Sequence, residues 1–323
     1  MSLRIFVDLV APPDTLQLLR EGTTGHKLVF PLKPAASVLS KGGPDPQFAT
    51  VDVAFGQPDT QAVSGASRLR WIHVSSAGIT RYDTPTFRAL AQARNLAVSN
   101  SSSVYAEPCA LHVLSFMLAQ ARMLPAALKS RVANGAPDWQ ALRHACVPLG
   151  GQTVLILGYG AIGKRLVELL RPFDMKIMAF RRKPRGDEGV PVIGETQLPR
   201  QLGAADHVIN ILPESPGTRH FFGAARFAAI KPGAVFYNIG RGATVEQDAL
   251  AQALHSGQLR AAWLDVADPE PLPEDHPLWA EPNCFITPHI AGGHLDEAMS
   301  LVRHFLENLE RFVHDRPLKD RVM

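Results

Sequence analysis

The stretch TVLILGYGAIGK, at residues 153–164, decides the fold. Its first half is an apolar run rich in β-branched side chains, which is typical of a buried strand. Its second half holds three glycines spaced G-x-G-x-x-G, and an apolar pattern at helical spacing follows at once. A strand, a glycine turn and a helix in this order indicate a dinucleotide-binding site. The alternative is an ordinary turn between a strand and a helix.

Each of the three glycines has a physical role in such a site. Gly158 allows the tight turn, Gly160 lets the backbone approach a pyrophosphate, and Gly163 lets the helix pack close to the strand. The N-terminus of the helix offers unpaired N–H groups and a partial positive charge to the phosphates. The predicted cofactor contacts in this turn are Gly158, Tyr159, Gly160, Ala161, Ile162 and Gly163.

The end of the next strand selects the nucleotide. A strand predicted at residues 175–180 is followed by Arg181, Arg182 and Lys183, where an NAD site normally has an acidic side chain for the ribose 2′-OH. A carboxylate would repel a 2′-phosphate, whereas a guanidinium binds it through paired, charge-assisted hydrogen bonds. The alternative is a solvated basic turn. The sequence therefore favours NADP as the cofactor, with NAD as the second choice.

Length and composition set the class of protein. The 323 residues suggest two domains, and the net charge of +3 is too small to indicate a nucleic-acid partner. The three cysteines are widely spaced, so neither a disulfide framework nor a metal site is expected. The longest apolar tract, at residues 109–119, is too short to span a bilayer, and we expect a cytoplasmic protein without a membrane partner.

Strand and helix patterns alternate along both halves of the chain, which is typical of parallel α/β sheets. Strands are expected at residues 4–10, 51–55, 69–74, 96–98, 208–212, 234–238, 261–266 and 284–286, and helices at 15–21, 84–94, 104–123 and 295–314. The last of these helices is expected to be a packing helix. Leu212 and Pro213, at the end of one strand, are further candidate cofactor contacts because open α/β sheets bind ligands there.

Three candidate catalytic residues follow predicted strands of the second half. Arg241 comes after the strand at 234–238, Glu270 lies five residues after Asp265, and His289 follows the strand at 284–286. Taken singly, each has an ordinary explanation: a cation near a helix start, a solvated loop acid and a turn histidine. Together, and beside a nucleotide site, they indicate a catalytic centre at the carboxyl edge of a sheet.

With these motifs the chain resembles the D-isomer-specific 2-hydroxyacid dehydrogenases, which include glyoxylate and hydroxypyruvate reductases. The resemblance covers nearly the whole length. It is carried by GYGAIG at 158–163, NIGRG at 238–242, LDV at 264–266 followed by Glu270-Pro271, PLW at 277–279 and TPH at 287–289, with weaker matches at SAG 76–78, Asn100 and Ala106-Glu107. Two positions depart from the pattern: Arg181 replaces the common acidic residue, and Pro108 stands where a larger polar or aromatic side chain is usual.

The resemblance implies an α/β fold of two doubly wound parallel-sheet domains, with a Rossmann-type nucleotide domain inserted into a flavodoxin-like substrate domain. The substrate (catalytic) domain is then discontinuous and comprises residues 1–100 and 291–323. The dinucleotide-binding domain comprises residues 101–290.

The resemblance also implies roles for the candidate residues. Protonated His289 would donate to the carbonyl oxygen of a 2-oxo acid, and Glu270 would orient the imidazole and stabilise its cation. Arg241 would bind the substrate carboxylate through its planar fork and polarise the adjacent carbonyl. Backbone amides at Ser76, Ala77 and Gly78 would form the second carboxylate anchor. Asn238 and Asp265 would position the nicotinamide ring, although capping of the strand-end turn is an alternative for Asp265.

We therefore expect an oxidoreductase that reduces a small 2-oxo acid, of the glyoxylate or hydroxypyruvate type, by hydride transfer from NADPH. The alternatives are a dehydrogenase of a bulkier 2-hydroxy acid and a nucleotide-sensing binding protein of the same fold. Formate dehydrogenases pair the histidine with an amide, so Glu270 counts against that activity. Because members of the family are commonly homodimers, we expect a homodimer whose ligands are small molecules.

Overall fold

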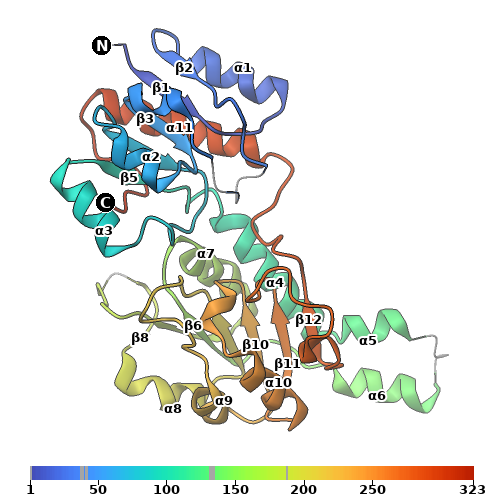
Figure 1. Ribbon diagram of the computed structural model, residues 1–323. Coiled ribbons are helices and arrows are strands. Elements are labelled where there is room, and N and C mark those ends of the chain that lie inside the picture. The colour runs from blue at the N-terminus through green and yellow to red at the C-terminus, as the bar shows by residue number, and fades with distance from the viewer. Residues whose placement is uncertain (1, 37–39, 41–42, 131–134, 187) are drawn as a thin grey trace. The chain divides into compact units, whose positions relative to one another are not determined.

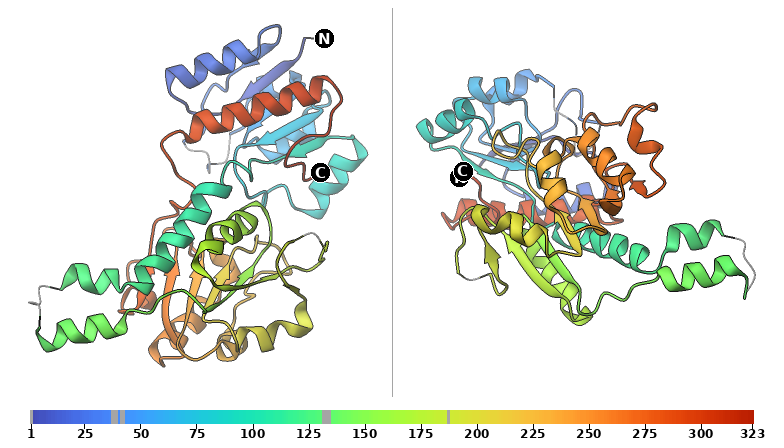
Figure 2. Two further views of the ribbon diagram at one scale, coloured as in Figure 1. Left: turned by 180° about the vertical axis from the view of Figure 1, so that it is seen from behind. Right: turned by 90° about the horizontal axis from the view of Figure 1, so that it is seen from below.

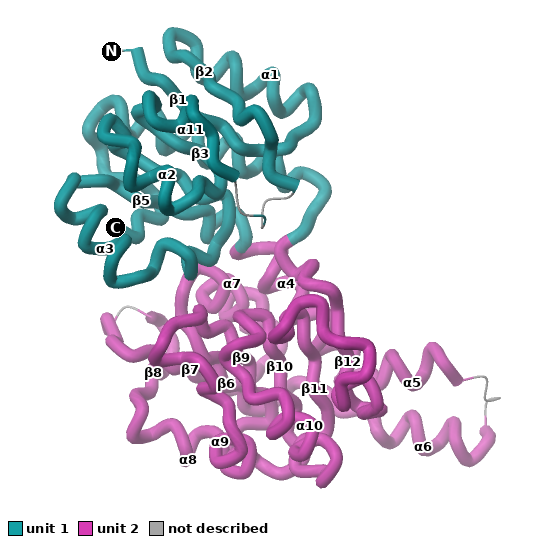
Figure 3. Tube along the Cα trace, in the orientation of Figure 1, with its two compact units in different colours: residues 1–105, 293–323 teal, residues 106–292 magenta. Residues whose placement is uncertain are grey.

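The computed structural model describes all residues except 1, 37–39, 41–42, 131–134 and 187. Its helices and strands are labelled in Figure 1. The chain divides into two compact units (Figure 3): unit 1 comprises residues 1–105 and 293–323, and unit 2 comprises residues 106–292. Each unit is built around one parallel sheet, as the sequence predicted.

Unit 1 has a five-stranded parallel sheet in the order β2-β1-β3-β4-β5, the flavodoxin-like order. Its strands are β1 (Arg4–Val7), β2 (Lys27–Val29), β3 (Val53–Gly56), β4 (Trp71–Val74) and β5 (Ala97–Ser99). Its helices are α1 (Pro13–Gly22), the 3-10 turn η1 (Pro46–Thr50), α2 (Thr60–Gly65), α3 (Pro85–Ala93) and α11 (Glu297–Val313). Helices α1 and α11 cover one face of the sheet, and α2 and α3 cover the other (Figures 1 and 2).

Helix α11 joins unit 1 through an aromatic stack. Phe305 lies parallel to Phe55 with ring centroids 4.4 Å apart and stacks on Trp71 at 5.4 Å. Such contacts add to the free energy gained from burying these large side chains. The prediction of a packing helix near the end of the sequence is confirmed.

Unit 2 has a seven-stranded parallel sheet in the order β12-β11-β10-β9-β6-β7-β8. Its strands are β6 (Thr153–Leu157), β7 (Lys176–Phe180), β8 (Val192–Ile193), β9 (His207–Asn210), β10 (Ala234–Asn238), β11 (Leu259–Leu264) and β12 (Cys284–Ile286). The strand order reverses between β6 and β9, and ligands of open α/β sheets bind at the carboxyl ends of the strands at such a switch point.

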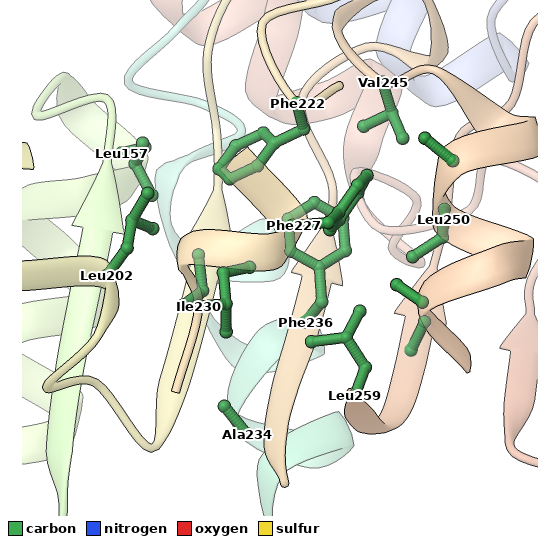
Figure 4. Packing of buried hydrophobic residues seen from close by; sticks show 14 of the residues in the cluster. Leu157, Leu202, Phe222, Phe227, Ile230, Ala234, Phe236, Val245, Leu250 and Leu259 are labelled. Carbon is green, nitrogen blue, oxygen red and sulfur yellow. The ribbon is translucent and has the colours of Figure 1, made fainter. Parts of the chain in front are cut away.

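The helices of unit 2 lie on both faces of this sheet, except for two, α5 and α6, that project away from it (Figure 2). They are α4 (Ala106–Ala121), α5 (Leu124–Lys129), α6 (Pro137–Ala145), α7 (Ala161–Leu170), α8 (Leu198–Leu202), α9 (Ala224–Ala229) and α10 (Gln247–His255), with 3-10 turns at Arg171–Phe173, Glu195–Gln197, Gly242–Thr244 and Pro277–Trp279. Figure 4 shows the core under α8, α9 and α10, where Phe236 of β10 packs edge-on against Phe222 and Phe227 at 4.8 and 5.3 Å. This packing fixes the strands whose carboxyl ends carry the candidate site.

Three sequence predictions need correction. The strand expected at 208–212 ends at Asn210, because the Asn210 side chain accepts a hydrogen bond from the N–H of Leu212 and turns the chain out of the sheet. The strand expected at 4–10 ends at Val7. The helix expected at 104–123 ends at Ala121, since Met123 adopts the left-handed conformation with φ of 52°, and α5 and α6 were not predicted.

None of the helices described is long and apolar enough to cross a membrane.

Candidate active site

The glycine turn lies between β6 and α7, as predicted. Gly158 has φ of +105°, and a Cβ there would lie 2.8 Å from the carbonyl oxygen of Ile211, so no other residue fits without strain. A Cβ on Gly163 would lie 2.5 Å from the carbonyl oxygen of Gly158, whereas a Cβ on Gly160 would meet open space. Gly160 is the N-cap residue of α7, so no side chain of the cap residue binds the free N–H groups at the start of this helix. The turn therefore leaves room for a phosphate group at the N-terminus of α7.

A pocket of about 510 Å³ opens beside this turn, wholly within unit 2. It collects seven of the predicted cofactor residues: Gly158, Tyr159, Arg181, Arg182, Lys183, Leu212 and Pro213. Its other lining residues, which sequence reasoning missed, are Phe180, Glu195, Gly217, Thr218 and Phe221. The segment PGT at 216–218, close behind a strand end, is the sequence signal that could have indicated two of them. The size and the glycine wall fit part of a dinucleotide.

The basic residues at the end of β7 differ in their surroundings. Arg181 is 21% exposed and pairs with Glu188, with Nη1 to Oε1 at 3.3 Å. Arg182 and Lys183 are exposed. The wall of the pocket therefore presents cations where a nucleotide ribose would lie in a Rossmann-type sheet.

Glu270 and His289 form a hydrogen-bonded pair, with Oε2 2.8 Å from Nδ1. The other oxygen of Glu270 accepts the N–H of Ala267 at 3.0 Å. Burial raises the pKa of Glu270, but the hydrogen bonds from His289 and Ala267 and the nearby charge of Arg241 outweigh it, so its pKa lies below the usual range. Glu270 is thus a carboxylate at neutral pH and can stabilise a protonated imidazole.

The loop that carries His289 is held by Asp265. His289 has a left-handed backbone with φ of 53°, and its N–H donates to the carbonyl oxygen of Asp265 at 2.9 Å. The buried carboxylate of Asp265 accepts hydrogen bonds from the Thr287 hydroxyl at 2.6 Å and from the N–H groups of Ile290 and Ala291 at 2.9 and 2.8 Å. Asp265 therefore caps the turn that follows β12, and this network offsets the cost of the backbone conformation of His289.

Arg241 follows β10 at the same edge of the sheet. Its Nη1 donates to the carbonyl oxygen of Gly240 at 2.6 Å. Burial lowers the pKa of Arg241, while Glu270, Glu214 and Cys109 act in the opposite direction. A guanidinium remains charged under all ordinary conditions. A Cβ on Gly242 would lie 1.9 Å from the carbonyl group of Ala267, so glycine at 242 lets the two loops approach.

The side chain of Asn238 connects the carboxyl ends of β9 and β10 by hydrogen bonds. Its side-chain oxygen accepts hydrogen bonds from Asn210 Nδ2 and from the N–H of Gly240, each at 3.1 Å, and its Nδ2 donates to the carbonyl oxygen of Arg241 at 3.2 Å. Asn210, fully buried, also donates to Thr244 Oγ1 at 2.7 Å. Sequence reasoning missed Asn210, although a polar residue ends its apolar strand just as Asn238 ends β10. The network holds Arg241 in place.

Ser76, Ala77 and Gly78 lie in unit 1, directly after β4. The Ser76 hydroxyl accepts a hydrogen bond from Gln57 Nε2 at 2.8 Å and donates to the carbonyl oxygen of Gly78 at 2.7 Å. Asn100 Nδ2 donates to the carbonyl oxygen of Ala77 at 2.6 Å. These bonds organise the loop, and its role as a substrate anchor stays a prediction.

Across the part of the chain that the structure describes, no group of three His, Cys, Asp or Glu side chains is placed to hold a metal ion.

A doubly wound sheet, a glycine turn and a hydrogen-bonded glutamate–histidine pair at its carboxyl edge are the features expected of a dinucleotide-dependent oxidoreductase. The sequence profile of the "D-isomer specific 2-hydroxyacid dehydrogenase, NAD binding domain" matches residues 114–291. The chain belongs to this family of NAD(P)-dependent oxidoreductases, as its motifs indicated.

Named relatives agree with this assignment. Glyoxylate/hydroxypyruvate reductase B of Citrobacter koseri is 32% identical over 271 residues, which cover 81% of each chain. The human glyoxylate reductase/hydroxypyruvate reductase is 35% identical over 229 residues, covering 70% of this chain and 69% of the human protein. Among solved structures, an NADPH-dependent glyoxylate/hydroxypyruvate reductase of Sinorhizobium meliloti, in complex with NADP and malonate, aligns with a TM-score of 0.74 at 25% identity over 100% of this chain and 97% of that one.

Proposed function

We propose that the protein is an NADPH-preferring reductase of small 2-oxo acids, with glyoxylate and hydroxypyruvate as the leading substrates. The pairing of Glu270 with His289 at 2.8 Å, near the charge of Arg241, carries the proposal. A nucleotide-sensing protein would need no such pair. A dehydrogenase of a bulkier 2-hydroxy acid remains the second candidate, because the same three side chains would serve it. The names of the bacterial and human relatives favour glyoxylate and hydroxypyruvate.

The acid–base step belongs to His289. When bound, the cofactor supplies hydride to the carbonyl carbon. Protonated His289 donates from Nε2 to the developing alkoxide, since its Nδ1 faces Glu270. In the oxidative direction, neutral His289 takes the proton back. Glu270 keeps the ring oriented and stabilises the cation, and Asp265 holds the loop that carries it.

Arg241 is proposed to bind the substrate carboxylate. Its guanidinium offers two parallel N–H donors to a carboxylate, and its charge stabilises the negative charge that develops on the adjacent oxygen. Burial makes this charge more effective than it would be in bulk water. Asn238 donates a hydrogen bond to the backbone carbonyl oxygen of Arg241. This bond fixes the backbone position from which the Arg241 side chain extends to the substrate.

The cofactor is proposed to be NADP, with its 2′-phosphate bound by the basic residues that follow β7. Arg182 and Lys183 are exposed at the pocket, and the glycine turn receives the pyrophosphate. The NADP complex of the Sinorhizobium meliloti relative supports this choice.

We predict that kcat/KM is at least about tenfold higher with NADPH than with NADH, because one charged phosphate contact contributes roughly 1.5–3 kcal/mol. Arg182→Ala should reduce this ratio mainly through the KM for NADPH. Initial rates with glyoxylate and each nucleotide test both statements. Equal efficiency with NADPH and NADH in the parent protein would refute the choice of NADP.

We predict that Glu270→Gln shifts the alkaline limb of reductive activity toward lower pH. Reduction requires the protonated imidazole, and an amide stabilises this cation less than a carboxylate does. A profile of kcat against pH with glyoxylate and saturating NADPH is the measurement. An unchanged limb would show that Glu270 is only a loop acid.

We also propose a homodimer in the cytoplasm. In unit 2, the α5–α6 pair projects away from the sheet (Figure 1). Leu124 and Leu128 on α5 are 43% and 83% exposed, and Leu111 and Leu118 on α4 are 44% and 37% exposed. Exposed leucines on two successive helices make this part of unit 2 the candidate surface for contact with a second copy. Sedimentation velocity should give a species of twice 35.1 kDa.

A further inference from the structure

The basic loop that follows β7 carries Arg181, Arg182, Lys183 and Arg185. It is organised around the carboxylate of Glu188. This side chain is only 3% exposed, although most of its neighbours in the loop are exposed. Its Oε1 accepts the N–H of Arg185 at 2.6 Å and Nη1 of Arg181 at 3.3 Å, and its Oε2 accepts the N–H of Gly186 at 2.8 Å. One carboxylate thus satisfies two backbone donors and one guanidinium.

Glu188 also joins this loop to the glycine turn. The hydroxyl of Tyr159 donates to the carbonyl oxygen of Glu188 at 2.5 Å. Tyr159 and Arg181 both line the pocket. Because both side chains bind Glu188, which does not line the pocket itself, Glu188 connects two parts of the pocket wall. The N–H of Arg185 is the main cause that places the pKa of Glu188 below its usual range, against the effect of burial. The carboxylate is therefore ionised at neutral pH.

This arrangement places the basic side chains of the loop in two different environments. The guanidinium of Arg181 is directed to Glu188, whereas the next two cations, Arg182 and Lys183, are exposed at the pocket. A carboxylate facing the pocket would repel a phosphate, but Glu188 is buried and is not among the residues that line it.

We propose that Glu188 is a positioning residue that sets the preference for NADPH, because it holds the loop in the shape that presents Arg182 and Lys183 to the 2′-phosphate. This inference rests on the proposed use of NADP. It adds a determinant of specificity that does not itself touch the cofactor.

Glu188→Gln tests the proposal with nearly unchanged volume. An amide has one acceptor oxygen, and its NH₂ group would face a backbone N–H, so at least one of the two backbone bonds is lost. We expect the affinity for 2′,5′-ADP to fall about tenfold, and that for 5′-ADP, which lacks the 2′-phosphate, to change less than about threefold. Isothermal titration calorimetry on the full chain measures both affinities without turnover. The kcat at saturating NADPH should stay near the parent value.

Glu195→Gln is the matched control. Glu195 lines the same pocket and is 59% exposed, and it pairs with Arg226 at 2.6 Å. This variant removes the same charge beside the pocket but leaves the loop bonds of Glu188 intact. Its affinity for 2′,5′-ADP should equal or exceed that of the parent. Tyr159→Phe, which removes the hydroxyl that holds the Glu188 carbonyl, should lose part of the same selectivity.

The outcomes separate the two proposals. If Glu188→Gln binds 2′,5′-ADP as tightly as the parent or more tightly, or if Glu195→Gln loses as much affinity, Glu188 does not position the loop, while the use of NADP stands. If the parent binds 2′,5′-ADP no better than 5′-ADP, the choice of NADP fails and the role of Glu188 fails with it.

Discussion

Replacing His289 with glutamine is expected to lower kcat by about two to four orders of magnitude, the usual contribution of a general acid. Glutamine can fill the space and accept or donate a hydrogen bond, but it cannot deliver a proton to the alkoxide. NADPH affinity should stay nearly unchanged, because the residues lining the nucleotide pocket do not include His289. Steady-state rates with glyoxylate, together with NADPH binding followed by fluorescence, measure the two effects.

His255→Gln is the matched control for this variant. His255 is 86% exposed at the end of α10 and pairs with Glu281 at 3.5 Å. It precedes β11, at the opposite edge of the sheet from the candidate site. This variant should keep the parent kcat. A loss below about tenfold in His289→Gln would remove the histidine from the chemical step.

Replacing Arg241 with alanine is expected to cost at least about 3 kcal/mol of transition-state stabilisation with a 2-oxo acid, as for truncation of one partner of a desolvated charge pair. Arg241→Lys keeps a positive charge but loses the planar two-point geometry, so it should also be strongly impaired. In both variants KM should rise and kcat should fall, because one group binds the carboxylate and polarises the carbonyl.

An uncharged carbonyl analogue supplies the internal control for Arg241. The parent should discriminate strongly between glyoxylate and this analogue, and both variants should lose that discrimination. Measurement of kcat/KM for the two substrates in the three proteins tests the role. Equal losses toward the charged and the uncharged substrate would make Arg241 structural, as its bond to the Gly240 carbonyl allows.

Local patterns in the sequence predict much of the fold. The bounds expected for β10 and β12 agree with the structure, because each is a short apolar run between strong turn signals. The glycine turn could be predicted from the sequence because close backbone contacts at Gly158 and Gly163 require glycine there, so the turn leaves a visible motif. The end of α4 and the start of α5 escape prediction because they depend on a left-handed conformation at Met123, a residue type with no preference for it.

The candidate site is predicted less completely than the fold. Arg241, Glu270 and His289 follow strand ends in sequence, and the structure joins Glu270 to His289. By contrast, the carboxylate of Asp265 binds the loop at 287–291, which only a tertiary contact can reveal. Glu188 and Thr218 belong to loops, where their roles depend on backbone groups that they meet in space.

Hydride transfer from NADPH to a small 2-oxo acid is the reaction that we propose for this protein. The most direct measurement is the initial rate of NADPH oxidation by the purified protein with a panel of 2-oxo acids at neutral pH, repeated with NADH. We predict the highest kcat/KM for glyoxylate or hydroxypyruvate with NADPH. A maximum with a branched or aromatic 2-oxo acid would move the activity to a bulkier substrate. Binding of NADPH without oxidation by any 2-oxo acid would exclude this reaction and support a nucleotide-sensing protein.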